Sequence, residues 1–249
     1  MKTENMPTPE EEAEKQAQFH NLLIRPNIGE FIGCFLFSFM GKLIHFAPLG
    51  LFLACFAGQY QHSNDVVYPM LCGLSLFISR SLVGHLTPAH FNPAISLLQY
   101  LRSEIPLVLA ITFIFVQFIG FLLGVTLFRA LITQTEFNDY IVMYEIASVD
   151  GIRKINRLQA FLLEIVLSVL LFMAYNLEYR QELTVAASWG FIQFVSYPLY
   201  GFTSNFSLLF VTSTVSYIFS PLTTPSFLLL YLNIFASLAA VLFTWVIDL

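Results

Sequence analysis

Two asparagines carry the clearest chemical signal in the sequence, because each stands at the predicted start of a short apolar helix. Asn92 precedes Pro93, and proline suits the first helical position since its missing N–H would be unpaired there anyway. Asparagine is a favoured cap for such a start, and Asn205 stands before a second apolar stretch. A helix start carries about half a positive charge. Two such ends within a membrane would repel cations, while the asparagine amides donate hydrogen bonds to an uncharged solute.

An Asn-Pro turn between two ordinary helices is the alternative interpretation of Asn92-Pro93, and the composition indicates which solvent surrounds the segment. Of the 249 residues, 57% are hydrophobic and only 11% are charged, whereas soluble domains carry about 25% charged residues. A soluble core of this size cannot bury so much apolar surface, so we predict an all-α integral membrane protein that crosses the lipid bilayer several times. Basic residues are not clustered, which argues against a nucleic-acid partner.

The elements that position the two asparagines are six long apolar stretches and two short ones. The long stretches, each enough to cross about 30 Å of hydrocarbon as a helix, lie at 28–58, 66–86, 105–132, 158–177, 184–202 and 226–247. The short stretches, 92–102 and 205–219, follow the second and the fifth long stretch. Interrupted segments at matching places in two halves indicate a pathway between inverted repeats. Three spans in each half also require that the halves be inverted in the membrane.

The chain divides at its polar segments. Residues 1–27 form an acidic tail, with five glutamates among the first fourteen residues and no apolar periodicity, so we predict that it is disordered. Residues 28–132 form the first repeat, 133–157 a connecting loop and 158–249 the second repeat. The first long stretch exceeds one span, so its helix is expected to end near Pro48.

Four motifs lie at successive places along the chain. They are Glu30-Phe31-Ile32-Gly33 in the first span, Ala89-His90-Phe91-Asn92-Pro93-Ala94 before the third, Gln117-Phe118-Ile119-Gly120 in the third, and Glu164 in the fourth. These motifs resemble those of the aquaporin, or major intrinsic protein, family, and the resemblance extends over about residues 28–247. It implies an aquaporin-like right-handed bundle of six transmembrane helices plus two half-helices, arranged as an inverted repeat. It also implies a homotetramer that passively conducts water or a small neutral solute.

The second half departs from the family pattern at the matching box. Where family members carry Asn-Pro-Ala-Arg, this chain has Asn205-Phe206-Ser207-Leu208. Asn205 can still cap the helix and Ser207 can hydrogen-bond near its start, so we take Asn92 and Asn205 as the pore asparagines. The change removes the arginine that belongs to the selectivity filter of the family.

Counted from the two asparagines, the resemblance assigns four positions to the selectivity filter. They are Cys72, Gln193, Phe202 and Leu208. This constriction is neutral and partly apolar, and such a constriction either passes uncharged solutes or stays dry and closed.

One arginine falls inside a predicted span, where a charge costs about 2.5–3.5 kcal/mol on insertion scales. Arg80 precedes Asn92 by twelve residues, as Gln193 precedes the second asparagine, so pseudo-symmetry would direct both side chains towards the pathway. In that interpretation Arg80 is a pore charge that repels cations, holds an anionic group or plugs the channel. In the alternative, it reaches the membrane interface or pairs with a buried carboxylate such as Glu164. The sequence favours neither interpretation.

Carboxylates and imidazoles near the two boxes are expected to support the loops. Glu30 and Glu164 occupy equivalent places in the two halves, where a carboxylate can accept loop N–H groups and turn the loop carbonyls towards the pore. An acid/base pair of an enzyme is the alternative for these two residues. His85 and His90 are further loop-supporting candidates. Because the sequence contains no Ser-His-Asp set, phosphate loop or metal-ligand spacing, we predict no catalytic residue, no enzyme activity, no metal and no cofactor.

The function predicted from these observations is a multi-pass membrane channel for water or a small neutral solute. Two alternatives stay open. The first is a non-conducting, aquaporin-like structural subunit, with other membrane subunits of a larger assembly as its partners. The second is a proton-coupled transporter that uses Glu30 and Glu164.

Overall fold

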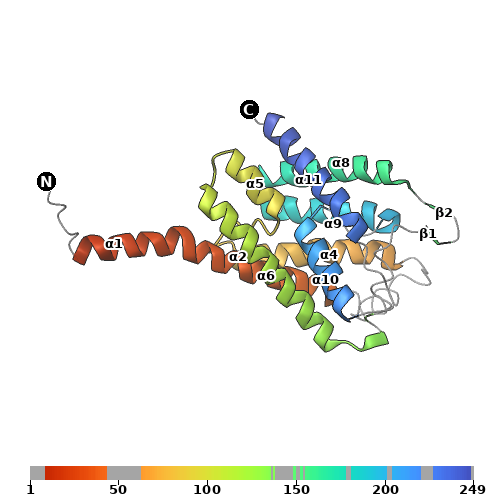
Figure 1. Cartoon of the computed structure of the whole chain (residues 1–249), viewed down its shortest axis with the longest axis horizontal. Helices are drawn as coiled ribbons and strands as arrows, with labels where there is room; N and C mark the ends of the chain where they lie inside the picture. Colours follow the sequence, from red (N-terminus) through yellow and green to blue (C-terminus); the bar gives the residue numbers. More distant parts are fainter. Residues whose placement is uncertain are drawn as a thin grey trace.

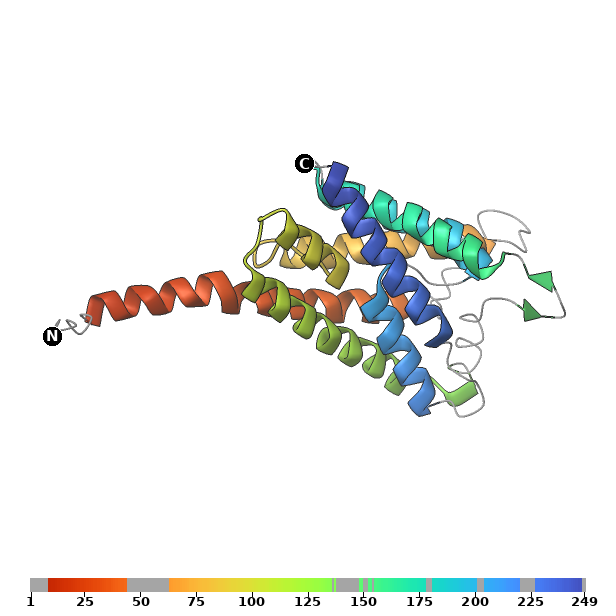
Figure 2. The same cartoon turned by 45° about the horizontal axis from the view of Figure 1, so that its top comes forward.

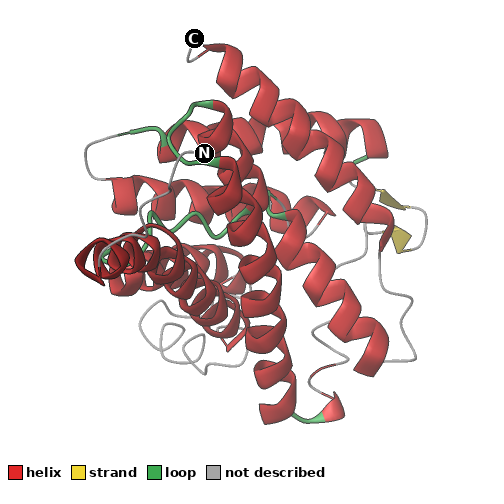
Figure 3. Ribbon diagram, turned by 60° about the vertical axis from the view of Figure 1, so that its left-hand side comes forward, coloured by secondary structure: helices red, strands yellow, loops and turns green. Residues whose placement is uncertain are grey.

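The described part of the chain is almost entirely helical. The computed structural model describes residues 9–43, 63–135, 137, 148–149, 152–153, 155–177, 181–200, 204–219 and 227–247. Figure 3 shows that helices make up nearly all of these residues, and that the only strands drawn among them lie at one edge.

The first half contains three long helices and one short helix between them. α1 (Pro9–Phe19) continues through a π-helical turn, η1 (His20–Ile24), into α2 (Arg25–Leu43). They are followed by α4 (Ser63–Val83), the short α5 (Pro93–Leu101) and α6 (Leu107–Leu131).

The second half repeats this order. Its helices are α8 (Arg157–Tyr175), α9 (Gln181–Tyr200), the short α10 (Phe206–Phe219) and α11 (Phe227–Ile247). Between the halves, β1 (Ser148–Val149) and β2 (Ile152–Arg153) pair antiparallel, with Ser148 opposite Arg153. The all-α prediction is confirmed for the bundle and misses only this small pair of strands, which Figure 1 shows outside the helices.

The six predicted spans coincide with α2, α4, α6, α8, α9 and α11, and the two short stretches coincide with α5 and α10. Among the described residues, four helices are long and apolar enough to cross a membrane. They are Glu14–Leu43, Leu107–Leu131, Arg157–Tyr175 and Leu230–Ile247, while Tyr68–Val83 and Phe206–Phe219 are shorter apolar helices. The expected end of the first span near Pro48 lies outside the described residues.

The structure corrects the prediction that residues 1–27 are disordered. From Pro9 onwards this tail is helical, and it extends α2 away from the bundle as a rod (Figures 1 and 2). Extending an existing helix adds one hydrogen bond per residue without the cost of nucleation. The sequence of α1 also consists largely of glutamate, alanine, lysine and glutamine, which are good helix formers.

Helix contacts repeat in the two halves. In the first half α2 packs on α6 and α4, as α8 packs on α11 and α9 in the second half. Each short helix packs on the last span of its own half and on the last span of the other: α5 contacts α6 and α11, and α10 contacts α11 and α6. The remaining large contact joins α4 to α9. The two short helices are therefore held inside one bundle to which both halves contribute equally.

Two close helix crossings depend on glycine. In α6, a Cβ on Gly120 would lie 2.6 Å from a backbone oxygen of α2, and one on Gly124 would lie 2.0 Å from the Ser38 hydroxyl. Between α4 and α9, a Cβ on Gly73 would lie 2.7 Å from the Ala186 carbonyl oxygen. Small residues spaced four apart allow helix backbones to approach closely in membranes, where packing replaces the hydrophobic effect between helices.

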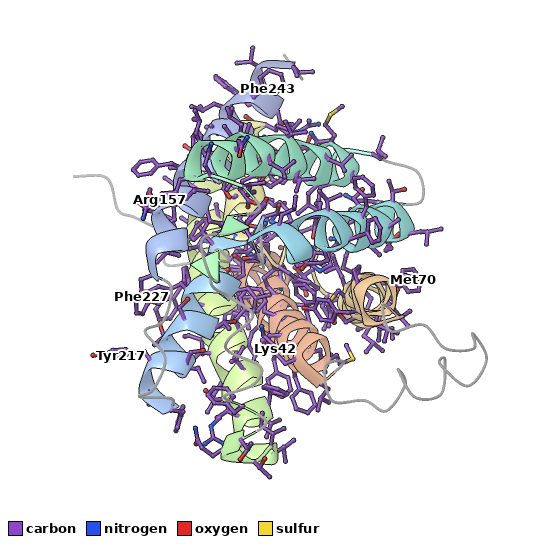
Figure 4. All side chains as sticks on the ribbon, turned by 90° about the vertical axis from the view of Figure 1, so that its right-hand side faces the viewer. Lys42, Met70, Arg157, Tyr217, Phe227 and Phe243 are labelled. Carbon is purple, nitrogen blue, oxygen red and sulfur yellow. The ribbon has the colours of Figure 1, made fainter. Side chains whose placement is uncertain are left out.

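The outer face of the bundle is covered with large apolar side chains. Met70, Tyr217 and Phe243 point away from the helices in Figure 4 and are 69%, 66% and 56% exposed. Lys42, by contrast, is only 4% exposed. Soluble proteins rarely expose so much contiguous apolar surface, so the bundle has its apolar face outside and its polar groups inside, as a membrane protein requires.

Candidate functional site

The two short helices begin in the same way inside the bundle. Asn92 caps α5 by accepting a hydrogen bond from Ala94 N–H at 3.0 Å through its Oδ1. Asn205 caps α10 by accepting from Leu208 N–H at 3.3 Å, and its Oδ1 also accepts from the Ser207 hydroxyl at 2.7 Å. The predicted cap at Asn205 is therefore present although proline is missing after it. The Ser207 hydroxyl is a second donor to the capping oxygen.

The amide groups of the two asparagines cross over to the opposite loop. Asn92 Nδ2 donates to the Ser204 carbonyl oxygen at 2.6 Å, and Asn205 Nδ2 donates to the Phe91 carbonyl oxygen at 2.7 Å. Both asparagines are buried, with 2% and 1% of their surfaces exposed. An amide NH2 has two N–H donors. Each asparagine donates one of them to the opposite loop, and its second N–H donor remains.

A left-handed residue precedes each asparagine. Phe91 has φ 49° and Ser204 has φ 60°, a region that residues other than glycine rarely adopt. This turn directs each carbonyl towards the facing asparagine, which explains why the crossed hydrogen bonds can form in both directions. The Phe91 ring is held against Gly33 of α2, where a Cβ would lie 2.1 Å from the ring.

Glu30 binds the first loop from α2. Its Oε2 accepts from the Thr87 hydroxyl at 2.9 Å and from His90 N–H at 3.2 Å, while its Oε1 accepts from Phe91 N–H. Gln117 of α6 donates to Oε1 at 2.8 Å. The carboxylate is fully buried, and its oxygens are occupied by loop N–H groups and side-chain donors.

Glu164 binds the second loop in the same way from α8. Its Oε1 accepts from Ser204 N–H and from Asn233 Nδ2 of α11, the latter at 2.7 Å, and its Oε2 accepts from Tyr200 at 2.9 Å. Asn233 is thus the counterpart of Gln117, since each is an amide of the last span of its half. Sequence reasoning missed Asn233, although an asparagine inside an otherwise apolar span was the signal that could have identified it.

The two histidines have different environments. His90 is buried, its Nδ1 lies 3.1 Å from the Ser96 hydroxyl, and its ring packs edge-on against Phe113 at 5.4 Å. His85 is exposed, and its backbone carbonyl, not its imidazole, accepts from Arg25 at 2.8 Å. The described hydrogen bond of His85 is that of its backbone, and a loop-supporting role of its imidazole stays a prediction.

Arg80 is buried against the same loop. It is 2% exposed, it donates to the Ala89 carbonyl oxygen, and its guanidinium carbon lies 4.5 Å from the centre of the Tyr175 ring. Tyr175 in turn donates to the His90 carbonyl oxygen at 2.8 Å. Among the described residues, Arg80 thus contacts no carboxylate such as Glu164, and its burial does not fit a side chain that reaches the membrane interface. Sequence reasoning missed Tyr175, and no local signal marks it, because its partners lie more than 80 residues away in the chain.

The expected filter positions are partly described. Cys72 and Leu208 are 5% and 3% exposed and belong to one buried cluster. Gln193 is fully buried, and neither its Nε2 nor its Oε1 has a hydrogen-bond partner among the described residues. Phe202 lies outside the described residues. The structure therefore buries three of the four positions but does not test their assignment to a filter.

The described interactions at this site are hydrogen bonds. Both buried glutamates are engaged by the loops, and no group of three or more histidine, cysteine, aspartate or glutamate side chains able to hold a metal occurs among the described residues. Two positive helix ends meet where two amides donate across the gap between the loops.

Comparisons with known proteins agree with this geometry. Residues 17–207 match the family model described as "Major intrinsic protein". The fold is similar to that in the "X-ray structure of the aquaglyceroporin from Plasmodium falciparum", with a TM-score of 0.67 and 20% sequence identity over 89% of this chain and 93% of that chain. No curated protein sequence matches.

Proposed function

The chain belongs to the major intrinsic protein family of membrane channels, and from this premise we propose that it conducts water or another small uncharged solute past Asn92 and Asn205. The fold, the apolar outer face and the multi-pass arrangement are those of an integral membrane protein. The solute and its route are what we propose here.

One observation carries this proposal: the crossed hydrogen bonds of Asn92 and Asn205. They fix both amides at the meeting point of α5 and α10, and each NH2 has a second donor for a solute lone pair. A solute that accepts two such hydrogen bonds is oriented there, which interrupts a chain of proton-hopping waters. A cation meets two positive helix ends and two donors, so the same geometry disfavours it.

The unpaired amide of Gln193 gives independent support. A buried polar group without a partner costs about 1–3 kcal/mol, and such groups in native proteins are generally satisfied by water. Gln193 belongs to the expected filter, together with Cys72, Phe202 and Leu208. We interpret its amide as facing a hydrated path, where it can accept from and donate to a neutral solute.

The experiment is solute flux into liposomes that contain the purified protein, measured by light scattering after an osmotic step. We expect water or glycerol flux clearly above that of empty liposomes, and a loss of most of that flux in Asn92→Ala. The matched control is Asn156→Ala, since Asn156 caps α8 by accepting from Gln159 N–H at 2.9 Å, away from the two loops. A folded wild-type protein with the flux of empty liposomes would contradict the proposal.

A second candidate function is a non-conducting structural subunit. The observation that favours it lies in the loop before α5: Arg80 and Tyr175 donate hydrogen bonds to the carbonyl groups that precede Asn92, so these groups are engaged by the protein. The same flux measurement decides between the two functions, because a structural subunit gives no flux in any variant.

For the partners, we propose a homotetramer in the bilayer, as is typical of the family. An apolar groove of about 600 Å³ runs over the outer face of α4 and α9, between Met70, Leu74, Phe191 and Phe194. Native mass spectrometry from detergent is expected to show four copies, and a monomer under mild conditions would contradict this. We propose no enzyme activity, since Glu30 and Glu164 are both committed to the loops.

A further inference from the structure

A polar vestibule leads towards the first loop. It has a volume of about 390 Å³ and lies between the loop before α5, the end of α5 and the end of α8. Arg102 and Glu104 line it, and their opposite formal charges offset each other. His90 and Tyr175 also line it, although they are only 3% and 4% exposed. The vestibule therefore ends at these two residues.

Behind Tyr175 lies the positive charge of Arg80, which no carboxylate of the described residues contacts. Arg80 meets a carbonyl oxygen, that of Ala89, and the face of the Tyr175 ring. Its Nε is buried and has no hydrogen-bond partner in the part of the chain that the structure describes. A guanidinium over an aromatic face is stabilised by a cation–π contact, which leaves its charge in place. Arg80 thus places a positive charge at the carbonyl side of this loop, while the Glu30 carboxylate holds its N–H side.

Protein donors engage the carbonyl groups that could otherwise attract a cation. Backbone carbonyls replace the water around an ion in cation-selective pores. Here the Ala89 carbonyl accepts from Arg80 and, at 3.4 Å, from Tyr175, and the His90 carbonyl accepts from Tyr175 at 2.8 Å. The Phe91 carbonyl accepts from Asn205. All three carbonyls before Asn92 are therefore occupied by protein donors.

We infer that Arg80, held by Tyr175, is the cation barrier of this channel and stands on the opposite side of the paired asparagines from Leu208. This inference rests on the proposed conduction of a neutral solute. Leu208 leaves the second half without a charge at the matching box. Arg80 supplies one from the first half, so protons and metal cations are rejected at the inner end of the vestibule.

The test compares two substitutions of Arg80 in the full chain reconstituted in liposomes. Arg80→Gln keeps a donor for the Ala89 carbonyl and removes the charge, whereas Arg80→Lys keeps the charge. Neutral-solute flux is measured by light scattering, and proton leak by a trapped pH dye under an imposed membrane potential. We expect about a tenfold rise in proton leak for Arg80→Gln, which removes a poorly screened unit charge. Arg80→Lys should give a clearly smaller rise, because its ammonium keeps the charge although it does not reproduce the planar guanidinium over the Tyr175 ring.

The matched control is Arg129→Gln. The guanidinium carbon of Arg129 also lies over an aromatic ring, 4.8 Å from the centre of the Phe137 ring, but at the far end of α6. It should leave proton leak at the wild-type value. If Arg80→Gln does not fold, Tyr175→Leu tests the barrier through the residue that holds Arg80. Losing the Tyr175 ring releases the guanidinium, so a several-fold rise in proton leak is expected.

The outcomes are distinct. Neutral flux in the wild type with unchanged proton leak in Arg80→Gln would overturn the barrier and leave the proposed function intact. Equal leak in the Gln and Lys variants would also overturn it, because the defect would then be structural. The absence of neutral flux in the wild type would instead overturn the proposed function, and the barrier with it.

Discussion

The loop before α5 and the loop before α10 share three supports: a capping asparagine, a left-handed residue before it, and a buried glutamate bound by an amide of the last span. Asn92, Phe91 and Glu30 provide them in the first half, with Gln117. In the second half they are Asn205, Ser204, Glu164 and Asn233. These supports are what the meeting of two half-helices requires.

The two loops differ in what surrounds this shared set. The first has Pro93 at the helix start and carbonyls occupied by Arg80 and Tyr175. The second has Phe206 at the helix start, with Ser207 bound to the capping oxygen. The difference indicates that the cap preserves the half-helix when the box is altered. In the proposed barrier role of Arg80, the charge that excludes cations then stands in the first half instead of the second.

The largest expected effect comes from removing a buried glutamate. Glu30→Leu leaves loop N–H groups and Gln117 without an acceptor, and we expect a loss on the order of 4 kcal/mol of stability, since each buried unpaired donor costs about 1–3 kcal/mol. Thermal unfolding in detergent measures it. Glu164→Leu should lower the stability by a similar amount. A loss of stability in only one of the two variants would contradict the equivalence of the two loops. Glu182→Leu, at an exposed position of α9, is the control.

A smaller effect on stability should distinguish the α2–α6 crossing from the α8–α11 crossing. Counting from Gln117 and Asn233, Gly124 of α6 corresponds to Ala240 of α11, so the first crossing has glycine where the second has alanine. Gly124→Ala should lower stability by about 1–3 kcal/mol through overpacking, because the new Cβ would lie 2.0 Å from the Ser38 hydroxyl. In an open helix the same change would stabilise. The measurement is again the unfolding midpoint in detergent, with Ala240→Gly as the reverse change, and an unchanged midpoint for Gly124→Ala would contradict the close crossing.

The smallest effect should come from restoring proline in the second box. Phe206→Pro presets the helix start, which is worth about 0.4–1 kcal/mol where the backbone fits. It also removes the Phe206 ring, whose centre lies 6.2 Å from that of Phe118. We therefore expect a net change in stability of less than about 1 kcal/mol and unchanged neutral flux. A large gain or loss of flux would show that proline, not the asparagine cap, sets the geometry of the second half.

The features that local signals encode were predictable from the sequence. Pro93 after Asn92, and apolar runs of span length, specify where helices start and how many cross the membrane. The tail was mispredicted because its charge and lack of apolar periodicity were weighed above its good helix formers, and because its continuity with α2 is not visible in its own sequence.

The contacts that cross between the halves were less predictable. Tyr175 reaches a carbonyl 85 residues away, and no periodicity encodes such a partner. Arg80 could be placed inside a span, but its choice between a carboxylate and an aromatic face depends on tertiary packing. The left-handed conformation of Ser204 had no signal either, since glycine, which favours it, is absent there.

The crossed bonds of the two asparagines also have a consequence for how the protein is made. The residues they join are 112 and 114 positions apart. At a synthesis rate of about 5–20 residues per second, the first loop waits roughly 6–20 seconds for its partner. During that interval Asn92 and the Phe91 carbonyl lack the contacts that the finished bundle gives them. The first half can therefore enter the membrane early, but its re-entrant loop reaches its final form only when the second half arrives.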